Sequence, residues 1–522
     1  MKTDLPVSTG RIGKLNACLG IVAALVVAFI LLLRVLIHFP FYDEAMHVHY
    51  LWLVSSGLKP GTDFFCSYPA LAYFFVAPFF KLFPDSVFVV LALRYISVAL
   101  YVLLGILLCQ NGRRLANDWL VALVPILLIA SSSNIGPFMV EFSIDPFAAL
   151  AAIAAMVLFF SPPDMRSLAA AASLSLLSVL FTPKYAFPLL AGLAGYCISY
   201  LMVSKRKVNV ILAAGIGGLL TLAAVLLLYW IYDVSFSTNF RYSTLLTSRL
   251  QIQRGYEPLY RELLGNMASR PLLGAILALG IAGWLKRSWK LPDHVTLSGT
   301  GILLGTLLFS IRMKFPLEQY QAPVYFSLAV FAPFASQLLG KSLVAQLVRT
   351  ILICAVIAGA AGSYPALTSE VMGTSVNYRE ANSNDPQIVK GPPAVWALAD
   401  MEQLLRTIPK EEPVVALWPH HPMLRRDLTA MTADDRPSLT SILPATDPVM
   451  RIFDPEYFRK ALAGKLPALV DIDRMQTNYP PGWYEVTAEF LEKNGDSYVR
   501  VPSSVQPNYF IYLRKDLIPG QQ

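Results

Sequence analysis

Long apolar runs separated by short polar stretches occupy the chain from its N-terminus to about residue 367. A helix needs about 20 predominantly apolar residues to cross the hydrocarbon core of a bilayer, and these runs reach or approach that length. We predict about eleven transmembrane helices, near 17–37, 86–109, 119–134, 144–160, 168–183, 186–203, 209–232, 271–285, 295–311, 320–340 and 348–367. The pattern is typical of a polytopic α-helical membrane protein.

The pattern changes from residue 368, where prolines, charges and short apolar stretches replace the long runs. The short stretches predict strands, at 413–417, 468–472 and 509–513. Helical patterns precede or separate these strands, at 395–408 and 456–464. Alternating strands and helices predict a small α/β domain that is too polar for lipid. We therefore expect two domains, a transmembrane domain over 1–367 and a soluble α/β domain over 368–522.

The composition agrees with this interpretation and excludes other classes. Of the 522 residues, 55% are hydrophobic and only 15% are charged, whereas soluble domains carry about 25% charged residues. The five cysteines form no CxxC pair, and most of them lie in or beside apolar segments, so we expect no disulfide framework or zinc site. The net charge of +8 suits an anionic membrane surface. No basic run is interleaved with aromatic residues, so we expect no nucleic-acid partner.

Basic residues fall in alternate loops and orient the helices. They occur before the first helix and then near 113–114, 166, 205–207, 286–290 and 341–349. Positively charged loops stay in the cytoplasm, so the loop that follows the first helix and the domain over 368–522 are both expected outside. The first apolar run is too long for a signal peptide and precedes no small-residue cleavage site, so we expect it to be retained. We predict a multi-pass protein of the inner (plasma) membrane.

One loop departs from this rule. The predicted external loop after Tyr232 carries five arginines: Arg241, Arg249, Arg254, Arg261 and Arg270. Binding of an anionic lipid head group would account for this positive charge on the external side.

The first external loop contains the most distinctive pattern. An adjacent acid pair, Asp43 and Glu44, opens an amphipathic segment that runs to Ser56 and ends at Gly57. We expect Ala45, Val48 and Leu51 to face the membrane, with Asp43 and His47 on another face of the helix. The apolar segment that follows, 69–83, is too short to span comfortably, so it is expected in the membrane interface or partway into the bilayer.

These motifs carry a family resemblance. The order is first helix, Tyr-Asp-Glu-Ala at 42–45, an amphipathic helix, an Asp63-Phe64 turn and a Pro-x-Leu-x-Tyr segment at 69–73. This order resembles the opening of the GT-C membrane glycosyltransferases, which include the protein O-mannosyltransferases and the lipid A aminoarabinose transferase. An acidic-Pro pair at 145–146 and a basic, tyrosine-containing segment at 312–320 continue the resemblance.

The resemblance implies a glycosyltransferase whose donor is a sugar on a polyprenyl phosphate. Transfer would occur on the external face, with inversion, to an envelope glycolipid such as lipopolysaccharide, a polysaccharide or a protein. Asp43 matches the family's general base. A phosphate leaving group needs little protonation, so one base that accepts the proton of the acceptor hydroxyl suffices. Glu44 points about 100° away on a helix and would orient the base or bind the acceptor. As the alternative, both acids simply stabilise a helix N-terminus.

Other candidate residues surround the same face. Those expected to bind the donor phosphate are Arg94, Lys184, Arg241, Arg312 and Lys314. Those expected to bind substrate are Asp145, His47, Asp63 and Tyr320, with Glu141 as a weaker neighbour of Asp145. A guanidinium within an apolar helix, as at Arg94, needs an anionic partner. The alternatives are snorkelling for the basic residues and a helix N-cap for Asp145.

The loop gives little support for a metal. Asp43 and His47 have a spacing that metal sites use, and a divalent ion assists some members of the resembled family. The aminoarabinose transferase carries a Glu-Lys pair before its proline, where this chain has Ser67-Tyr68. We expect no required cofactor or metal, with a divalent cation left open.

Two other functions remain open. A transporter or flippase of lipid-linked sugars would also need a basic cavity, but it favours broken or charged helices near mid-membrane and paired repeats. In this chain the polar residues cluster at the external helix ends. A membrane scaffold would give no reason for an acid pair, a buried arginine and basic residues to converge on one face.

Overall fold

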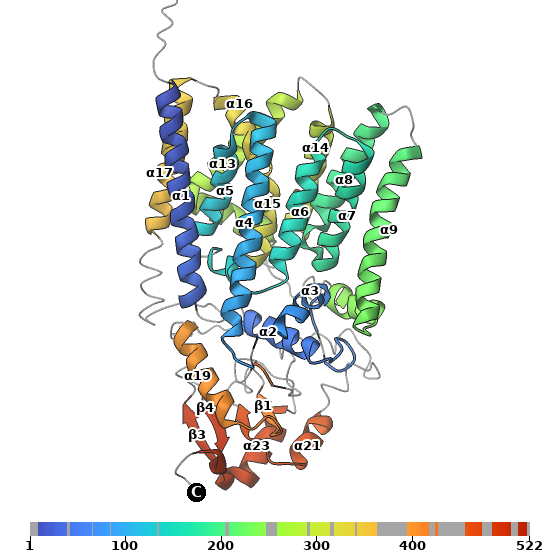
Figure 1. Cartoon of the computed structure of the whole chain (residues 1–522), viewed down its shortest axis with the longest axis vertical. Coiled ribbons are helices and arrows are strands. Elements are labelled where there is room, and N and C mark those ends of the chain that lie inside the picture. Colours follow the sequence, from blue (N-terminus) through green and yellow to red (C-terminus); the bar gives the residue numbers. More distant parts are fainter. Residues whose placement is uncertain are drawn as a thin grey trace, which may run out of the picture.

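The computed structural model describes residues 9–38, 42–64, 66–83, 85–132, 135–203, 208–246, 258–289, 293–313, 318–339, 342–362, 394–416, 423–425, 455–471, 483–502 and 510–518. A helical bundle forms one end of the molecule and a smaller α/β domain forms the other (Figure 1). Helix α1, Thr9–Ile37, begins at the end of the bundle that lies farthest from the α/β domain.

The bundle helices coincide with the predicted spans. Besides α1 they are α4 Val89–Ala116, α5 Trp119–Ser131, α6 Asp145–Phe159, α7 Met165–Phe181, α8 Ala186–Val203, α9 Val208–Ile231, α13 Pro271–Ser288, α14 His294–Arg312, α15 Glu318–Ala329, α16 Ala335–Leu339 and α17 Leu343–Gly362. Within the described residues, seven helical segments are long and apolar enough to cross a membrane. Helix α12, Leu259–Ser269, forms with α13 a pair bent by 107° that would be an eighth. Because α5, α6 and α7 are shorter, the count of eleven stays a prediction.

Small residues bring bundle helices into close contact, most clearly between α8 and α14. A Cβ added at Gly301 would lie 2.1 Å from the carbonyl oxygen of Ala191, and one at Gly305 would lie 2.3 Å from that of Phe187. Backbones can approach this closely only where side chains are absent or small. These glycines therefore fix the packing of α8 against α14.

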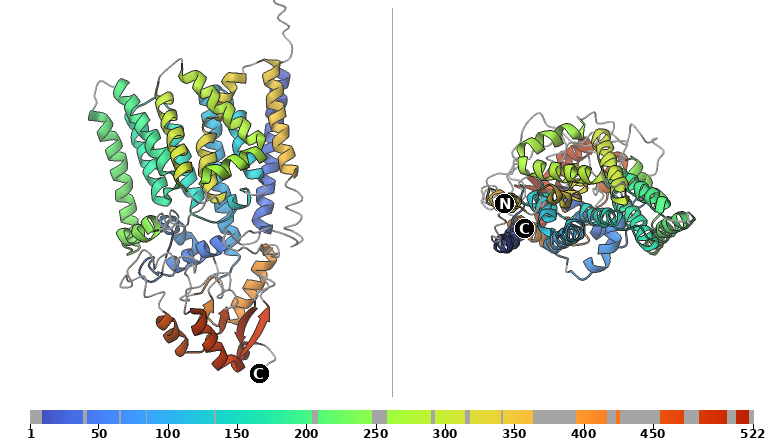
Figure 2. Two further views of the ribbon diagram at one scale, coloured as in Figure 1. Left: turned by 180° about the vertical axis from the view of Figure 1, so that it is seen from behind. Right: turned by 90° about the horizontal axis from the view of Figure 1, so that it is seen from above.

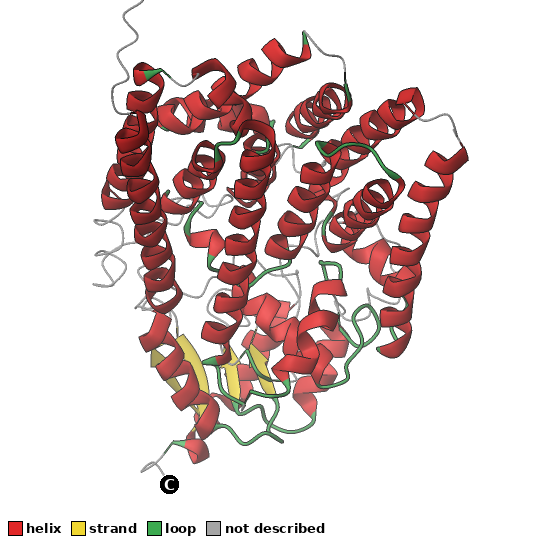
Figure 3. Cartoon of the chain, turned by 45° about the horizontal axis from the view of Figure 1, so that its top comes forward, coloured by secondary structure: helices red, strands yellow, loops and turns green. Residues whose placement is uncertain are grey.

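In the part of the α/β domain that the structure describes, four strands form a sheet in the order β1-β2-β4-β3. Its strands are β1 Val414–Ala416, β2 Leu469–Asp471, β3 Tyr498–Pro502 and β4 Phe510–Arg514, with β1 and β2 parallel and the other pairs antiparallel (Figure 3). Its helices are α19 Ala394–Thr407, α21 Pro455–Ala463 and α23 Trp483–Asn494. The three predicted strands and two predicted helices are thereby confirmed, whereas β3 and α23 were not predicted.

Contacts at the start of α4 hold the α/β domain against the bundle. Glu402 on α19 accepts hydrogen bonds from the Ser86 hydroxyl and the Val87 N–H, each at 2.9 Å. Lys410 forms an ion pair with Asp85. Helix α19 also lies at the end of α1 in both side views (Figures 1 and 2). The domain is therefore attached to the same end of the bundle as the first loop.

The first loop folds into α2, Tyr42–Ser55, and α3, Leu71–Phe80, which lie between the bundle and the α/β domain (Figure 1). Glycines in the left-handed region turn the chain after α2, at Gly57 (φ 85°) and Gly61 (φ 81°). The helix itself was predicted, but its environment differs from the expected membrane surface. Every residue from Glu44 to Leu51 is buried, because α2 packs against protein on nearly all sides.

Candidate active site

A pocket lies where α2 meets the bundle. It holds about 530 Å³ of space that no atom fills, its open mouth included. It is lined by Asp43, His47, Tyr101, Ile135, Phe138, Met139, Glu141, Ser143, Asp145, Tyr185, Ala322, Pro323 and Phe326. Three predicted site residues, Asp43, His47 and Asp145, thus share one pocket although they come from two different helices.

Asp43 lies in the first turn of α2 and is partly buried. A carboxylate at this position is favoured by the positive end of the helix dipole. Tyr68 lies beside the pocket residue His47, and burial, with a further contribution from the charge of Asp43, raises the pKa of Tyr68 well above its usual range. The Tyr68 hydroxyl is therefore neutral.

Glu44 and Arg94 form a fully buried, bidentate ion pair. Arg94 Nε donates to Glu44 Oε1 at 2.8 Å and Arg94 Nη2 donates to Glu44 Oε2 at 2.5 Å, and both side chains have 0% exposure. Arg94 Nη1 donates to the carbonyls of Val35 and His38, at 2.9 and 2.7 Å. The Phe142 N–H donates to Glu44 Oε1 at 3.0 Å. One pair thereby ties together the end of α1, the start of α2, α4 and the segment before α6.

This geometry changes the roles expected for Glu44 and Arg94. The sequence indicated that Arg94 needs an anion and named the donor phosphate; in the structure the anion is the Glu44 carboxylate. A buried guanidinium needs a partner whether or not a donor is bound, and Glu44 is such a partner. Glu44 is also the residue next to Asp43 in the chain. The arrangement favours a positioning role for both residues, because it fixes the helical turn that carries Asp43.

Lys184 and Asp145 form a second ion pair, at the pocket itself. Lys184 Nζ lies 2.9 and 2.7 Å from the two carboxylate oxygens of Asp145. The same ammonium lies 4.5 Å from the ring centre of Tyr320, which is buried. Asp145 lines the pocket, so the Lys184 ammonium lies one contact away from it. Asp145, Lys184 and Tyr320, which are widely separated along the chain, are thus neighbours.

His47 is a neutral, buried group of the pocket. Its Nδ1 lies 2.6 Å from the Tyr73 hydroxyl, and its ring centre lies 4.5 Å from that of Tyr68. Burial, with a contribution from the charge of Lys184, lowers the pKa of His47 to about 3. Within the described residues, no group of three His, Cys, Asp or Glu side chains is placed to hold a metal ion. His47 thus stays a candidate substrate-binding residue, as a neutral ring that lines the pocket.

Glu141 adds a carboxyl group that the sequence ranked low. It lines the pocket and lies 2.8 Å from Nε2 of His38, a residue that sequence reasoning missed. Burial, with the nearby charge of Glu44, raises the pKa of Glu141 well above its usual range. The signal that could have indicated this contact is the position of His38, directly after the first apolar run and shortly before the acid pair.

Three of the remaining predicted residues do not line the pocket. Asp63 is exposed and accepts a hydrogen bond from the Lys59 N–H at 2.8 Å. Arg241 is exposed after α10, Phe236–Phe240, with its guanidinium carbon 5.6 Å from the Tyr242 ring centre. Arg312 is exposed at the end of α14, and Lys314 lies outside the described residues. These basic residues stay candidates for the rim of the site.

The comparisons with known proteins concern the fold. No protein-family model matches the chain, and no curated protein matches it. Its structure is similar to that of ArnT from Cupriavidus metallidurans bound to undecaprenyl phosphate, with a TM-score of 0.61 and 13% identity, covering 97% of this chain and 98% of ArnT. The apo state of that ArnT gives a TM-score of 0.60. The archaeal oligosaccharyltransferase AglB from Archaeoglobus fulgidus matches at 0.42 and 13% identity, over 97% of this chain and 75% of AglB. The chain has the GT-C fold of membrane glycosyltransferases.

Proposed function

We propose that this protein transfers a sugar from a polyprenyl-phosphate donor to an acceptor at the membrane surface. The observation that carries the proposal is the position of Asp43, a partly buried carboxylate in a pocket where α2 meets the bundle. The GT-C fold supports it, and the ArnT structure with this fold holds undecaprenyl phosphate. The acceptor would be an envelope glycolipid, a polysaccharide or a protein.

In the proposed reaction Asp43 is the general base. The acceptor oxygen bonds to the anomeric carbon from the side opposite the phosphate, as the bond between that carbon and the phosphate oxygen breaks. The acceptor proton passes to the Asp43 carboxylate, and the bonding electron pair leaves with the phosphate. Inversion at the anomeric carbon follows from this single displacement. General-base assistance of this kind contributes about 10²–10⁴-fold to a rate.

The neighbouring acids are less suited to this step. Glu44 and Asp145 already form ion pairs with Arg94 and Lys184, and either acid would have to give up part of that pair to accept a proton. Their proposed roles are therefore positional: Glu44 fixes the start of α2 through Arg94, and Asp145 holds Lys184 beside the pocket.

Lys184 is the proposed ligand of the donor phosphate. Its ammonium is bonded to Asp145, which lines the pocket, and it can exchange part of this interaction for a phosphate oxygen. Arg241, Arg312 and Lys314 would add positive charge at the rim that attracts the lipid phosphate. His47, Tyr320 and the pocket aromatics would contact the sugar. The site would face the external side of the inner membrane, as the basic loops predict.

Transfer from a labelled donor tests this function against a lipid-linked sugar flippase. Proteoliposomes with the protein, a radiolabelled sugar on polyprenyl phosphate and envelope glycolipid acceptors are incubated and the lipids are separated. A transferase moves the label onto the acceptor, and Asp43→Asn abolishes most of this product. A flippase leaves the label on the polyprenyl phosphate and changes only its leaflet, which would overturn the proposal.

A further inference from the structure

A three-residue segment, Met423 to Arg425, connects the pocket helix α2 with the α/β domain. All three residues are deeply buried, with exposures of 0%, 5% and 4% along the segment. Met423 and Leu424 belong to the same hydrophobic cluster as residues of α2, although 374 positions separate His49 of that helix from Met423. The segment therefore packs as part of the bundle side of the structure.

At the α2 end, the contact is a hydrogen bond from a histidine to the backbone. His49 Nδ1 donates to the Met423 carbonyl, and the His49 side chain is buried. Its ring stacks on Trp52 with an interplanar angle of 19° and ring centres 6.1 Å apart. Burial lowers the pKa of His49 to about 4, so the ring is neutral near pH 7. His49 is on the same helix as Asp43 and His47, which line the pocket.

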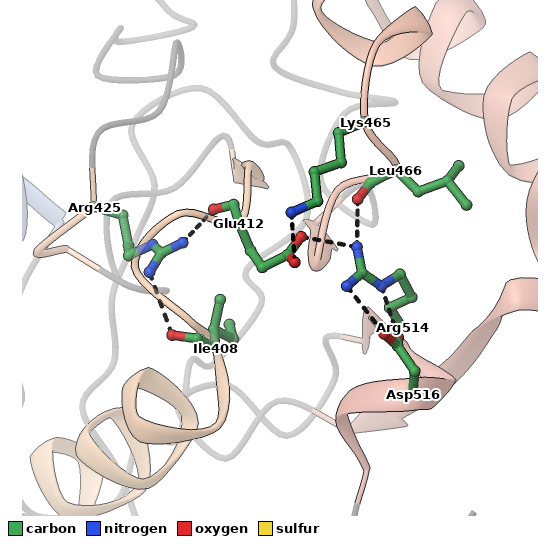
Figure 4. A network of polar contacts seen from close by, with 7 residues as sticks. All are labelled: Ile408, Glu412, Arg425, Lys465, Leu466, Arg514 and Asp516. Atoms are coloured by element: carbon green, nitrogen blue, oxygen red, sulfur yellow. Dashed lines mark hydrogen bonds and ion pairs between the residues drawn. The ribbon is translucent and has the colours of Figure 1, made fainter. Parts of the chain in front are cut away.

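At the domain end, Arg425 reaches back into the turn before β1. Its guanidinium donates to the Ile408 carbonyl, at 3.3 Å, and to the Glu412 carbonyl (Figure 4). A buried guanidinium is stable only where its N–H groups find such acceptors. Arg425 thus attaches the segment to the loop between α19 and β1.

That loop is itself held by charged side chains. The Glu412 carboxylate lies 2.9 Å from Arg514 Nη1 and 2.8 Å from Lys465 Nζ, which lowers its pKa to about 2 (Figure 4). Arg514 also donates to the Leu466 carbonyl at 2.7 Å and pairs with Asp516. A continuous set of contacts therefore runs from β4, through Glu412 and Arg425, to His49 on α2.

We propose that Met423–Arg425 is a clip by which the α/β domain holds α2 in register with the bundle, so that His49 and Arg425 are positioning residues for Asp43. Two contacts would then hold α2. The Glu44–Arg94 pair fixes the start of the helix, and the clip fixes its middle at His49. This inference rests on the proposed function for its kinetic consequence, because a misplacement of about 1 Å can cost on the order of 10²-fold in rate. Its structural content, the immobilisation of α2, is independent of any activity.

Matched variants of the full-length protein test the clip. His49→Gln keeps a donor toward the Met423 carbonyl, whereas His49→Phe keeps the ring and removes the donor. Arg425→Gln breaks the attachment at the domain end. Arg459→Gln is the control, because Arg459 forms only exposed ion pairs in the described part of the same domain, with Glu456 and Glu489.

Two readouts are compared: amide hydrogen exchange of α2, and kcat against donor KM in the transfer assay. We expect His49→Phe and Arg425→Gln to speed exchange in α2 by about tenfold or more and to lower kcat by about tenfold, with donor KM nearly unchanged. His49→Gln should recover most of the kcat, and Arg459→Gln should match wild type.

Unchanged exchange in α2 for His49→Phe would overturn the clip, whatever the kinetics, and equal loss of kcat in both His49 variants would overturn the role of the hydrogen bond. If Arg425→Gln does not fold, the two His49 variants still decide. If the wild-type protein transfers no sugar, the proposed function fails, while the exchange comparison still tests the clip.

Discussion

The buried Glu44–Arg94 pair gives a prediction that separates two roles for Arg94. Arg94→Met keeps an unbranched apolar side chain but removes the guanidinium. The Glu44 carboxylate would then stay at 0% exposure with the Phe142 N–H as its described donor, and two backbone carbonyls, of Val35 and His38, would lose theirs. Removing one partner of a buried ion pair costs about 3–5 kcal/mol because the other charge remains uncompensated. We therefore expect the free energy of unfolding to fall by about that amount.

A second variant checks the physical reason. Glu44→Leu combined with Arg94→Met removes both charges, so it should cost clearly less than Arg94→Met alone, by about 1–3 kcal/mol. Arg94→Lys should fall between wild type and Arg94→Met, because an ammonium keeps the charge but cannot bind the carboxylate through two parallel hydrogen bonds.

The assay is unfolding by sodium dodecyl sulfate in mixed micelles, followed by tryptophan fluorescence, alongside a donor-binding titration. Arg459→Gln, which breaks exposed pairs, should change stability by less than about 0.5 kcal/mol and serves as control. A contrary result would be near-normal stability of Arg94→Met with donor affinity reduced about tenfold to a hundredfold. Arg94 would then bind the donor phosphate, as the sequence alone predicted.

Three further predictions concern other parts of the account. Lys184→Met should weaken donor binding by about tenfold or more in a titration, because it removes the positive charge beside the pocket residue Asp145; unchanged affinity would move the phosphate site to the rim. The free energy of unfolding should fall as pH drops below about 6.5, because between that pH and the lowered pKa values of His47 and His49, about 3 and 4, only the unfolded chain binds these protons. Each histidine should contribute a slope of about 1.4 kcal/mol per pH unit. Equilibrium unfolding from pH 7 to 4 measures this, and His49→Gln should flatten the slope. An impermeant thiol reagent should modify Lys493→Cys from outside intact cells and Trp289→Cys only after lysis; the reverse pattern would invert the topology.

The elements that the sequence predicted well are those whose signal is local. Long apolar runs indicate bundle helices, and short apolar stretches predicted β1, β2 and β4 because little else in the domain is continuously apolar. Strand β3 was missed because its five residues include Arg500 and Pro502, which weaken a strand pattern. Its pairing with β4, which the sequence alone does not show, makes it a strand.

The site was predictable as a set of residue types, and its pairings were not. Asp43, His47 and Asp145 were expected on one face, and they do share the pocket. The need of Arg94 for an anion was evident, yet nothing local indicated that Glu44, 50 positions earlier, supplies it. The burial of α2 was also unpredictable, since it comes from contacts with distant parts of the chain, among them the one between His49 and Met423 at a separation of 374 residues.

The measurement that tests the central claim most directly is the transfer rate of Asp43→Asn at saturating donor and matched protein level. Asparagine has nearly the size of aspartate, and loss of the charge in the first turn of α2 costs only about 0.3–1 kcal/mol, so a purely structural role for Asp43 would tolerate the change. As the general base, Asp43 should lose about 10²–10⁴-fold in kcat on this substitution while donor binding stays close to wild type. A variant that retains more than about a tenth of the wild-type kcat would contradict the account, because a base that contributes at least about 10²-fold could not be replaced at so small a cost.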